Sequence, residues 1–352
     1  MKRLLVWALV LAAPVVAQDG TTTDALPTVR SVTGDLHVWR HAQDKLDAVK
    51  DAVRVAPGDR LGTRKDKFGL LVTDEGTMIS LSGVEVGHER GLSLERTKGQ
   101  LLIKIHKGKI VLESFQTAVR VETPNGAVEG SRAHLVVQVE GEKTKVTAVD
   151  GTFSFSNSLG TVKVEGGQES SADRTTRPSE PKRADVEKAV GEVAPIEGQN
   201  LIKNPGFEDG LTNWAAEPID GREAIALENA GHAGGRSVRL EISNRVFGKE
   251  RPTWLGFKQN LALTSGKKYL FRAYVRLETR EGAVKPFCSI GAIGGPRWMV
   301  DPAEKGWRRV GGVYAVEAGG DVRHRISIEV QIETEKYDAM LWADDFMLLE
   351  LK

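Results

Sequence analysis

Alternation of apolar and polar residues in short runs is the feature that most restricts how this chain can fold. In LLIKIHKGKIVLESF, Leu101, Ile103 and Ile105 fall on one side of an extended backbone, and Leu102 and Lys104 fall on the other. A period of two residues is typical of a strand with one buried face. Turns containing Gly separate such runs by about 8–12 residues, as short antiparallel strands require. The pattern predicts an all-β domain over residues 29–168, either a sandwich or a short solenoid.

Alternation returns in the last part of the chain, over residues 199–352. In HRISIEVQIE, Ile326, Ile328 and Val330 alternate with Ser327 and Glu329. A stretch of about 150 residues is large enough to bury a core of its own. This region is therefore predicted to be a second all-β domain, an antiparallel sandwich.

Residues 169–198, between these regions, lack the pattern. They include three prolines, many charged residues and almost no large apolar side chain. Such a segment cannot bury enough apolar surface to offset the entropy lost on ordering. We expect a flexible linker with a short helix around Asp185 to Val190. Another turn or two of helix is expected within HAQDKLDAVKDAVRV, residues 41–55, from its apolar spacing.

The first 17 residues have the pattern of an export signal. Two basic residues precede an apolar run from Leu4 to about Ala13, and the small residues Val15 and Ala17 come before a cleavage point. The alternative is a membrane anchor, but about 14 apolar residues cannot cross a ~30 Å hydrocarbon core as a helix. We expect residues 1–17 to be removed, leaving a secreted or periplasmic protein with no membrane span.

Charge and motifs exclude several classes of function. The 49 basic and 48 acidic residues leave a net charge of +1, whereas a nucleic-acid-binding protein needs a clustered basic excess. The single cysteine, Cys288, has no partner for a disulfide within the chain, and its apolar neighbours predict a buried structural thiol. The sequence contains no Gly-x-Ser-x-Gly, His-Glu-x-x-His, P-loop or Gly-x-Gly-x-x-Gly motif. We therefore expect no enzymatic activity.

The first domain resembles a FecR-type domain, a β-rich extracytoplasmic module of bacteria. The resemblance rests on APGDRLGTRKDKFGLLVTDEGTMISL and on TPNGAVEGSRAHLVVQVEGEKTKVTAVDGTFSFSNSLGTVKVEGGQ, and it covers Leu36 to Gln168. It implies an interaction module that contacts envelope proteins. Some family members pass a signal from an outer-membrane receptor to a sigma factor. That role needs a cytoplasmic segment and a membrane-spanning helix, neither of which is found in this sequence.

The second domain resembles carbohydrate-binding modules that have a galactose-binding-like jelly-roll fold. The motifs that carry the resemblance are NLIKNPGFEDGLTNWAAE, HAGGRSVRL, LTSGKKYLFRAYVRLE, GWRRVGGVYAV and LWADDFMLLEL. The resemblance implies a jelly roll that binds a polysaccharide or another glycan. It also implies a structural calcium, because Glu208 and Asp344 match positions used for that ion, and the backbone near Arg236 would be a third ligand.

Alternatives to the calcium site remain open at this point. Glu208 could simply accept N–H bonds from its turn while Asp344 faces solvent. Asp345 is not expected to bind, since neighbouring residues on a strand face opposite ways.

Aromatic residues are the candidates for sugar recognition, because the C–H face of a pyranose stacks on an aromatic ring. The resemblance implies core packing for Trp214 and Trp307, which fall in segments that the family uses for its core, and Trp342 falls in the final strand region. We expect a structural role for all three. Trp254 and Trp298 lie beside Pro and Gly, which predicts loops, and they are the candidate platforms. Arg251 and Arg297 are their candidate polar partners, although core packing is the competing interpretation for both tryptophans.

The sequence thus predicts an exported, non-catalytic protein whose two β-domains are joined by a flexible linker and whose jelly roll binds carbohydrate. Two other classes remain. One is a structural or protein-interaction component of the cell surface that binds no sugar, and the other is a signalling-related FecR homologue.

Overall fold

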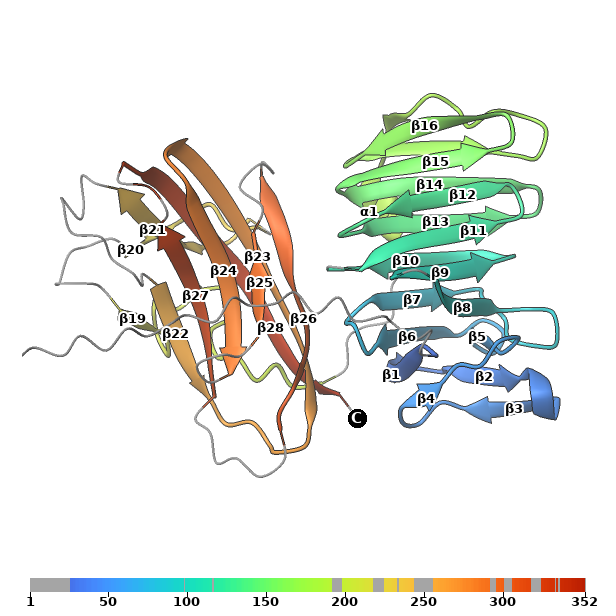
Figure 1. The fold of residues 1–352 in the computed structure, drawn as a ribbon, viewed down its shortest axis with the longest axis horizontal. Helices are drawn as coiled ribbons and strands as arrows, with labels where there is room; N and C mark the ends of the chain where they lie inside the picture. Colours follow the sequence, from blue (N-terminus) through green and yellow to red (C-terminus); the bar gives the residue numbers. More distant parts are fainter. Residues whose placement is uncertain are drawn as a thin grey trace, which may run out of the picture.

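Four β-sheets make up two domains in the computed structural model (Figure 1). The structure describes residues 26–97, 99–115, 117–191, 198–217, 225–232, 234–243, 256–291, 296–300, 306–317, 324–332, 334 and 336–351. Residues 1–17, predicted to be an export signal, lie outside this range. Within the described residues, none of the helices is both long and apolar enough to span a membrane.

Sheets I and II form the first domain, with nine strands each. Sheet I has the order β18 (Lys182–Arg183), β17 (Gln168–Ala172), β14 (Lys143–Asp150), β13 (His134–Glu140), β10 (Gly108–Glu113), β7 (Met78–Ser82), β6 (Phe68–Thr73), β1 (Thr28–Gly34), β4 (Val53–Arg54). Sheet II has the order β16 (Gly160–Glu165), β15 (Thr152–Asn157), β12 (Gly126–Gly130), β11 (Ala118–Thr123), β9 (Gln100–Ile105), β8 (Leu92–Thr97), β5 (Arg60–Gly62), β2 (His37–Arg40), β3 (Lys45–Ala48).

The chain passes between these two sheets hairpin by hairpin. Hairpins β6–β7 and β13–β14 belong to sheet I, whereas β8–β9, β11–β12 and β15–β16 belong to sheet II. The two sheets therefore grow together as the sequence advances (Figure 1). The alternating residues Leu101, Ile103 and Ile105 are fully buried between them. The all-β prediction is confirmed.

Sheets III and IV form the second domain, a sandwich of two five-stranded sheets. Sheet III has the order β19 (Ala215–Glu217), β22 (Gly256–Leu261), β27 (His324–Ile332), β24 (Val284–Gly291), β25 (Arg297–Met299). Sheet IV has the order β20 (Ile225–Glu228), β21 (Ser237–Ser243), β28 (Asp338–Leu351), β23 (Lys268–Glu281), β26 (Trp307–Ala315).

Aromatic rings fill one end of this sandwich. Phe207 and Trp214 come from the turns that follow the start of the domain, and their ring centroids are 5.1 Å apart. Phe257 and Phe346 close the cluster at 5.5 Å and 5.0 Å from Trp214. Trp214 is therefore a core residue, as its sequence context predicts. Cys288 is also buried in this core, as expected for a structural thiol.

The segment 169–198 is folded over much of its length, which corrects the prediction of a flexible linker. β17 pairs with β14, and β18 pairs with β17, so both extend sheet I. The polar side chains of this segment satisfy their hydrogen bonds locally. Ser170 Oγ, for example, donates to the Ser179 carbonyl at 2.7 Å. Residues 192–197 lie outside the described residues.

The short helix expected around 185–190 is present as α1 (Val186–Val190). The side chain of Asp185 caps its first turn. Ala189 packs on Val111 and Val136 from the outer side of sheet I. Lys109 Nζ donates to the Val190 carbonyl at 2.8 Å, at the end of the helix. By contrast, the helix expected within 41–55 is wrong, because that segment forms a single 3₁₀ turn (His41–Gln43) and strands β3 and β4.

Strand β6 of sheet I is apolar on both faces. β6 reads FGLLVT, and every residue from Gly69 to Thr73 is buried. Leu71 faces the core between sheets I and II, whereas Leu70 and Val72 join a different cluster on the outer side. Continuous apolar runs of this kind are typical of strands covered on both faces.

That outer cluster joins the two domains. Its buried members are Leu70, Val72, Met78 and Phe115 from the first domain and Leu270, Met347, Leu349 and Leu351 from the second. Sheet IV thus packs on sheet I. Ion pairs flank the cluster, with Lys268 Nζ 2.9 Å from Asp74 Oδ1 and Arg308 Nη1 2.5 Å from Asp150 Oδ1. The domains are docked through an apolar contact and not merely tethered.

Candidate functional site

The outer face of sheet III carries polar side chains in register across its central strands. Ser289 on β24 lies opposite Ser327 on β27, and Ser327 lies opposite Lys258 on β22. In the next row, Phe287 on β24 lies opposite Glu329 on β27. The residues between these positions, such as Ile326, Ile328 and Val330, point into the core. Strand alternation therefore places these polar groups together on one surface.

Hydrogen bonds link three of these side chains into a network. Ser289 Oγ and Ser327 Oγ are 2.8 Å apart, and Ser327 Oγ donates to Glu329 Oε1 at 2.5 Å. Arg325 Nη2 lies 3.7 Å from the same carboxylate oxygen. Ser327 and Glu329 are only 4% and 6% exposed, whereas Ser289 and Arg325 are more accessible. The network forms a polar floor with accessible side chains at its border.

A planar stack adjoins this polar floor. Arg297, on the edge strand β25, lies with its guanidinium 4.7 Å from the centroid of the Phe287 ring. β25 pairs with β24, which places Arg297 opposite Ser289 and Met299 opposite Phe287. Arg297, a candidate from the sequence, is therefore beside the serine network, whereas Ser289, Ser327, Glu329 and Phe287 were missed. Their signal was the strict alternation in β24 and β27, which puts polar residues on one face.

Trp298 is not the exposed stacking platform that the sequence suggested, because it is buried. Its side chain is 5% exposed and packs on Phe271, with ring centroids 4.8 Å apart. Its indole also fills the space next to Gly312, where a methyl group would lie 2.7 Å from Nε1. Trp298 anchors β25 to the sandwich. Trp254 and Arg251, the other two candidates, lie outside the described residues.

Two further tryptophans lie on the outer face of sheet IV rather than in the core. Trp342 on β28 is opposite Arg276 on β23, and Trp307 on β26 is opposite the same arginine. The Arg276 guanidinium lies 3.9 Å from the Trp342 ring centroid and 5.7 Å from that of Trp307. Trp342 Nε1 donates to Glu228 Oε2 at 2.8 Å. Trp342 is 4% exposed and therefore buried, as expected for a structural residue, but it packs on Arg276 and not between the two sheets. Trp307 is only half-buried and contacts the same arginine.

Carboxylates from distant parts of the second domain converge near the loop 231–236. Glu208 Oε1 accepts the Arg236 N–H at 2.8 Å, and Asp344 Oδ2 accepts the His232 N–H at 2.8 Å. A methyl group at Gly231 would lie 2.7 Å from both the Arg236 carbonyl oxygen and Asp344 Oδ2. Glu208, Asp344 and the backbone of Arg236, matched from the sequence, are therefore close together. Asp344 is 2% exposed, so it does not face solvent.

Asp345 lies in the same cluster, contrary to the expectation from strand alternation. Its φ is +49°, in the left-handed region, and the register of β28 against β23 shifts by one residue at this point. This β-bulge turns Asp345 toward His232, whose Nδ1 lies 3.0 Å from Asp345 Oδ2. Burial, and then the charge of Asp345, raise the pKa of Asp344 to about 6.

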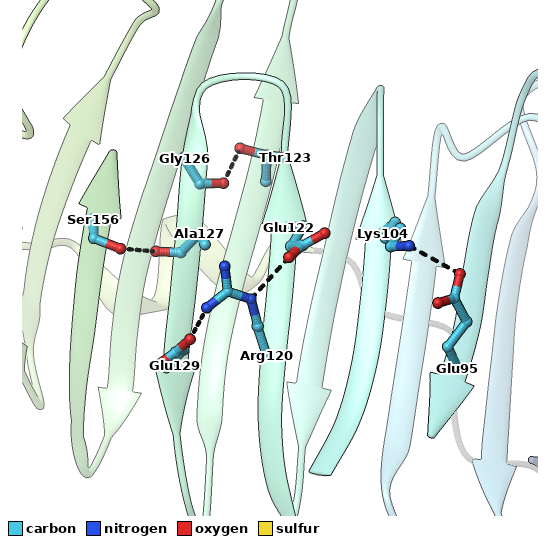
Figure 2. Close-up of polar contacts among 9 residues, drawn as sticks. All are labelled: Glu95, Lys104, Arg120, Glu122, Thr123, Gly126, Ala127, Glu129 and Ser156. Carbon is cyan, nitrogen blue, oxygen red and sulfur yellow. Dashed lines mark hydrogen bonds and ion pairs between the residues drawn. The ribbon is translucent and has the colours of Figure 1, made fainter. Parts of the chain in front are cut away.

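The outer face of sheet II carries a different arrangement, shown in Figure 2. Arg120 on β11 lies between Glu122 and Glu129. Its Nε donates to Glu122 Oε1 at 2.8 Å, and its Nη1 donates to Glu129 Oε1. Lys104 on β9 donates to Glu95 on β8 at 2.9 Å. Four neighbouring strands therefore carry side chains of both charge signs on this accessible face.

Buried charges lie at the contact between the domains. Glu113 on β10 faces Arg309 and Arg272, with Oε2 3.4 Å and 3.6 Å from their Nη1 atoms. Burial alone would raise the pKa of Glu113, but Arg309 and its neighbours outweigh it and lower the value to about 2. Burial, and then Arg309, lower the pKa of His134 to about 3. At neutral pH this contact holds an ionised glutamate and an uncharged histidine.

No protein-family model and no curated protein matches the chain. Among solved structures, a family 61 carbohydrate-binding module in complex with β-1,4-galactotriose is 21% identical with a TM-score of 0.31, covering 43% of this chain and 98% of that one. A family 16 carbohydrate-binding module is 18% identical, with a TM-score of 0.31 and coverage of 43% and 99%.

A protein described as an anti-sigma factor from Parabacteroides distasonis is 16% identical, with a TM-score of 0.25 and coverage of 35% of this chain and 54% of that one. At these identities and TM-scores, what those proteins bind is a property of those proteins alone.

Proposed function

We propose that this is an exported, non-catalytic protein whose second domain binds carbohydrate on the outer face of sheet III. One observation carries the proposal: the hydrogen-bonded floor of Ser289, Ser327 and Glu329 beside the stacked Phe287 and Arg297. Sugars offer hydroxyl groups that both donate and accept, next to apolar C–H faces. Hydroxyl and carboxylate oxygens beside a planar stack match that chemistry.

Two residues outside the described range complete the proposal. Arg251 and Trp254 precede β22 in the sequence, and β22 enters sheet III with Gly256 opposite Glu329. We assign Trp254 the role of stacking platform and Arg251 that of a polar partner. Trp298 supports the site through its anchoring of β25.

Binding of the full-length protein to a panel of immobilised polysaccharides tests this function. Retention on at least one polysaccharide is expected, and Glu329→Gln or Trp254→Ala should weaken it about tenfold, the effect of losing a charged hydrogen bond or a stacked ring. Glu281→Gln, an exposed carboxylate at the end of β23, is the matched control and should bind as the parent does. No retention on any polysaccharide refutes the proposal.

We also propose that calcium binds near the loop 231–236. Calcium prefers oxygen ligands, and the Glu208 and Asp344 carboxylates and the Arg236 carbonyl supply them there. Although several of these side chains are near one another, no three His, Cys, Asp or Glu side chains among the described residues are placed to hold one metal ion, so backbone oxygens would complete the set. Calcium should raise the melting temperature of the parent protein but not that of Asp344→Asn. Equal melting temperatures with calcium and with a chelator refute this site.

The first domain is proposed to be an interaction module for envelope proteins. Its support is the accessible, mixed-charge face of sheet II, which lies opposite the face covered by the second domain. Pull-down from an envelope fraction with the full-length protein tests it. Replacing Arg120 and Lys104 by Gln should release any specific partner, whereas unchanged capture contradicts a role for this face.

A further inference from the structure

A cleft of about 1380 Å³ lies where the two domains meet. The first domain contributes the turns around Arg132, Asp150 and Gly166, and the second contributes β25 and the start of β26. The carbohydrate face proposed above does not account for this cleft.

Charge in the cleft favours an acidic ligand. Four arginines line it: Arg132, Arg297, Arg308 and Arg309. Among the residues that the structure describes, two carboxylates do so, Asp150 and Glu165, and Asp150 is engaged by Arg308 at 2.5 Å. A guanidinium presents paired N–H donors that match a carboxylate. Both domains thus contribute guanidinium groups to the lining of the cleft.

Arg309 also lines the cleft and keeps one donor without an acceptor, although its charge is paired with Glu113, whose Oε2 lies 3.4 Å from Nη1. The Arg309 side chain is 4% exposed, and Nη2 donates to the Ala133 carbonyl at 3.2 Å. Nε has no hydrogen-bond partner among the described residues, although it is buried. An unmade hydrogen bond on a buried charged group is costly. An oxygen-rich ligand, or water, in the cleft would supply the acceptor.

The cleft is continuous with the polar face of sheet III through one short strand. Arg297 and Met299 on β25 line the cleft, and they also lie in the same rows as Ser289 and Phe287 on the outer face of sheet III. Met299 is 41% exposed at this border. A chain molecule lying across sheet III would pass over β25 and reach the first domain.

We propose that the cleft is the second half of the glycan site and takes a sugar unit that carries a carboxylate. This inference rests on the proposed function, because it extends the carbohydrate face of sheet III. The first domain then contributes directly to binding, with Arg132 as a contact residue from a turn that the second domain could not supply alone.

Pairs of polysaccharides with and without charge test the inference in the full-length protein. The probes are polygalacturonate, alginate and hyaluronan, each with its methyl-esterified form, plus neutral β-1,4-galactan. The acidic form is expected to bind about tenfold more tightly than its ester, the effect of one charged hydrogen bond. Arg132→Gln should remove this preference, and Arg132→Glu should reverse it. Arg90→Gln, an exposed arginine away from the cleft, is the matched control.

The outcomes separate the two proposals. Three results would refute the proposal for the cleft but leave the proposed carbohydrate face intact. They are equal binding of acid and ester, binding of galactan alone, and an acid preference that both Arg132 variants retain. No binding to any probe overturns both. A preference that is lost in Arg132→Gln, kept in Arg90→Gln and weakened by added salt supports the cleft. Melting temperatures of the variants show whether each is folded.

Discussion

Glu113 and Arg309 face each other across the boundary between the two domains, with Glu113 Oε2 3.4 Å from Arg309 Nη1 and both side chains largely buried. Replacing one member of such a pair leaves the other charge buried without compensation. Glu113→Gln should therefore lower the free energy of unfolding by about 3 kcal/mol. Urea denaturation measures the change. Glu142→Gln, in an exposed turn of the first domain, should change stability by less than about 0.5 kcal/mol. Equal effects of the two substitutions would contradict a role for the pair.

Lowering the pH should reduce the free energy of unfolding over a pH range that is set by the pKa of His134. Burial and the charge of Arg309 lower the pKa of this side chain from 6.5 to about 3, while Glu113 opposes the shift and Arg272 and His232 add to it. The unfolded chain takes up a proton near pH 6.5, and the folded chain does not until about pH 3. Stability is thus fully present above pH 6.5 and is lost as pH falls toward 3, by at most about 1.4 kcal/mol per pH unit.

Urea denaturation between pH 5 and pH 7 isolates this contribution by comparing the parent with His134→Gln. The parent should lose stability with falling pH more steeply than the variant does. The same slope in both proteins would show that His134 is charged in the folded state or accessible to solvent.

The close approach of the domains at Gly76 leaves no room for a side chain. Its φ is +88°, and a methyl group there would lie 2.9 Å from the Gly312 Cα atom of the second domain. Gly76→Ala should lower the free energy of unfolding by about 2–4 kcal/mol, the sum of backbone strain and overpacking. Gly99 has a similar φ of +76° and no neighbour within 4 Å of the added methyl. Gly99→Ala should therefore show the backbone cost alone, and calorimetry should place its melting temperature above that of Gly76→Ala.

Cys288 should be inert to thiol reagents in the native protein. It is fully buried, and burial, followed by the charge of Glu329, raises the pKa of its thiol well above the ordinary value. Only the thiolate reacts. Ellman's reagent should label no thiol in native protein at pH 8 and one thiol per chain in denaturant. Rapid labelling without denaturant would mean that the sandwich opens at β24.

Period-two alternation was sufficient to predict the buried side chains between the sheets of both domains. It identified Leu101, Ile103 and Ile105 in one domain and Ile326, Ile328 and Val330 in the other as buried side chains. Alternation could not reveal the docking of the domains, because sheet I is covered on both faces. The signal for the docking was the unbroken LLV of β6, which contains Leu70. The unbroken IVL of β10 marks a different cover, because Val111 packs against α1.

The candidate sites were harder to predict because they depend on local breaks in regular structure. Asp345 faces the same way as Asp344 only because of the β-bulge in β28, and no simple spacing rule signals that extra residue. Trp298 follows the sequence Gly-Gly-Pro-Arg, which predicts a loop. Pairing of β25 with β24 instead turns the indole into the core. The polar residues that follow Gln168 fold because sheet I offers β17 an edge to pair with.

The apolar contact between sheets I and IV has a practical consequence for anyone dividing this protein into pieces. A fragment that starts at residue 199 would present Leu270, Met347, Leu349 and Leu351 to water as one patch. A fragment that ends at residue 168 would expose the other half of the contact and lose β17, β18 and α1 as well. Both truncated forms should self-associate, because in the full-length protein each domain shields the apolar surface of the other from water.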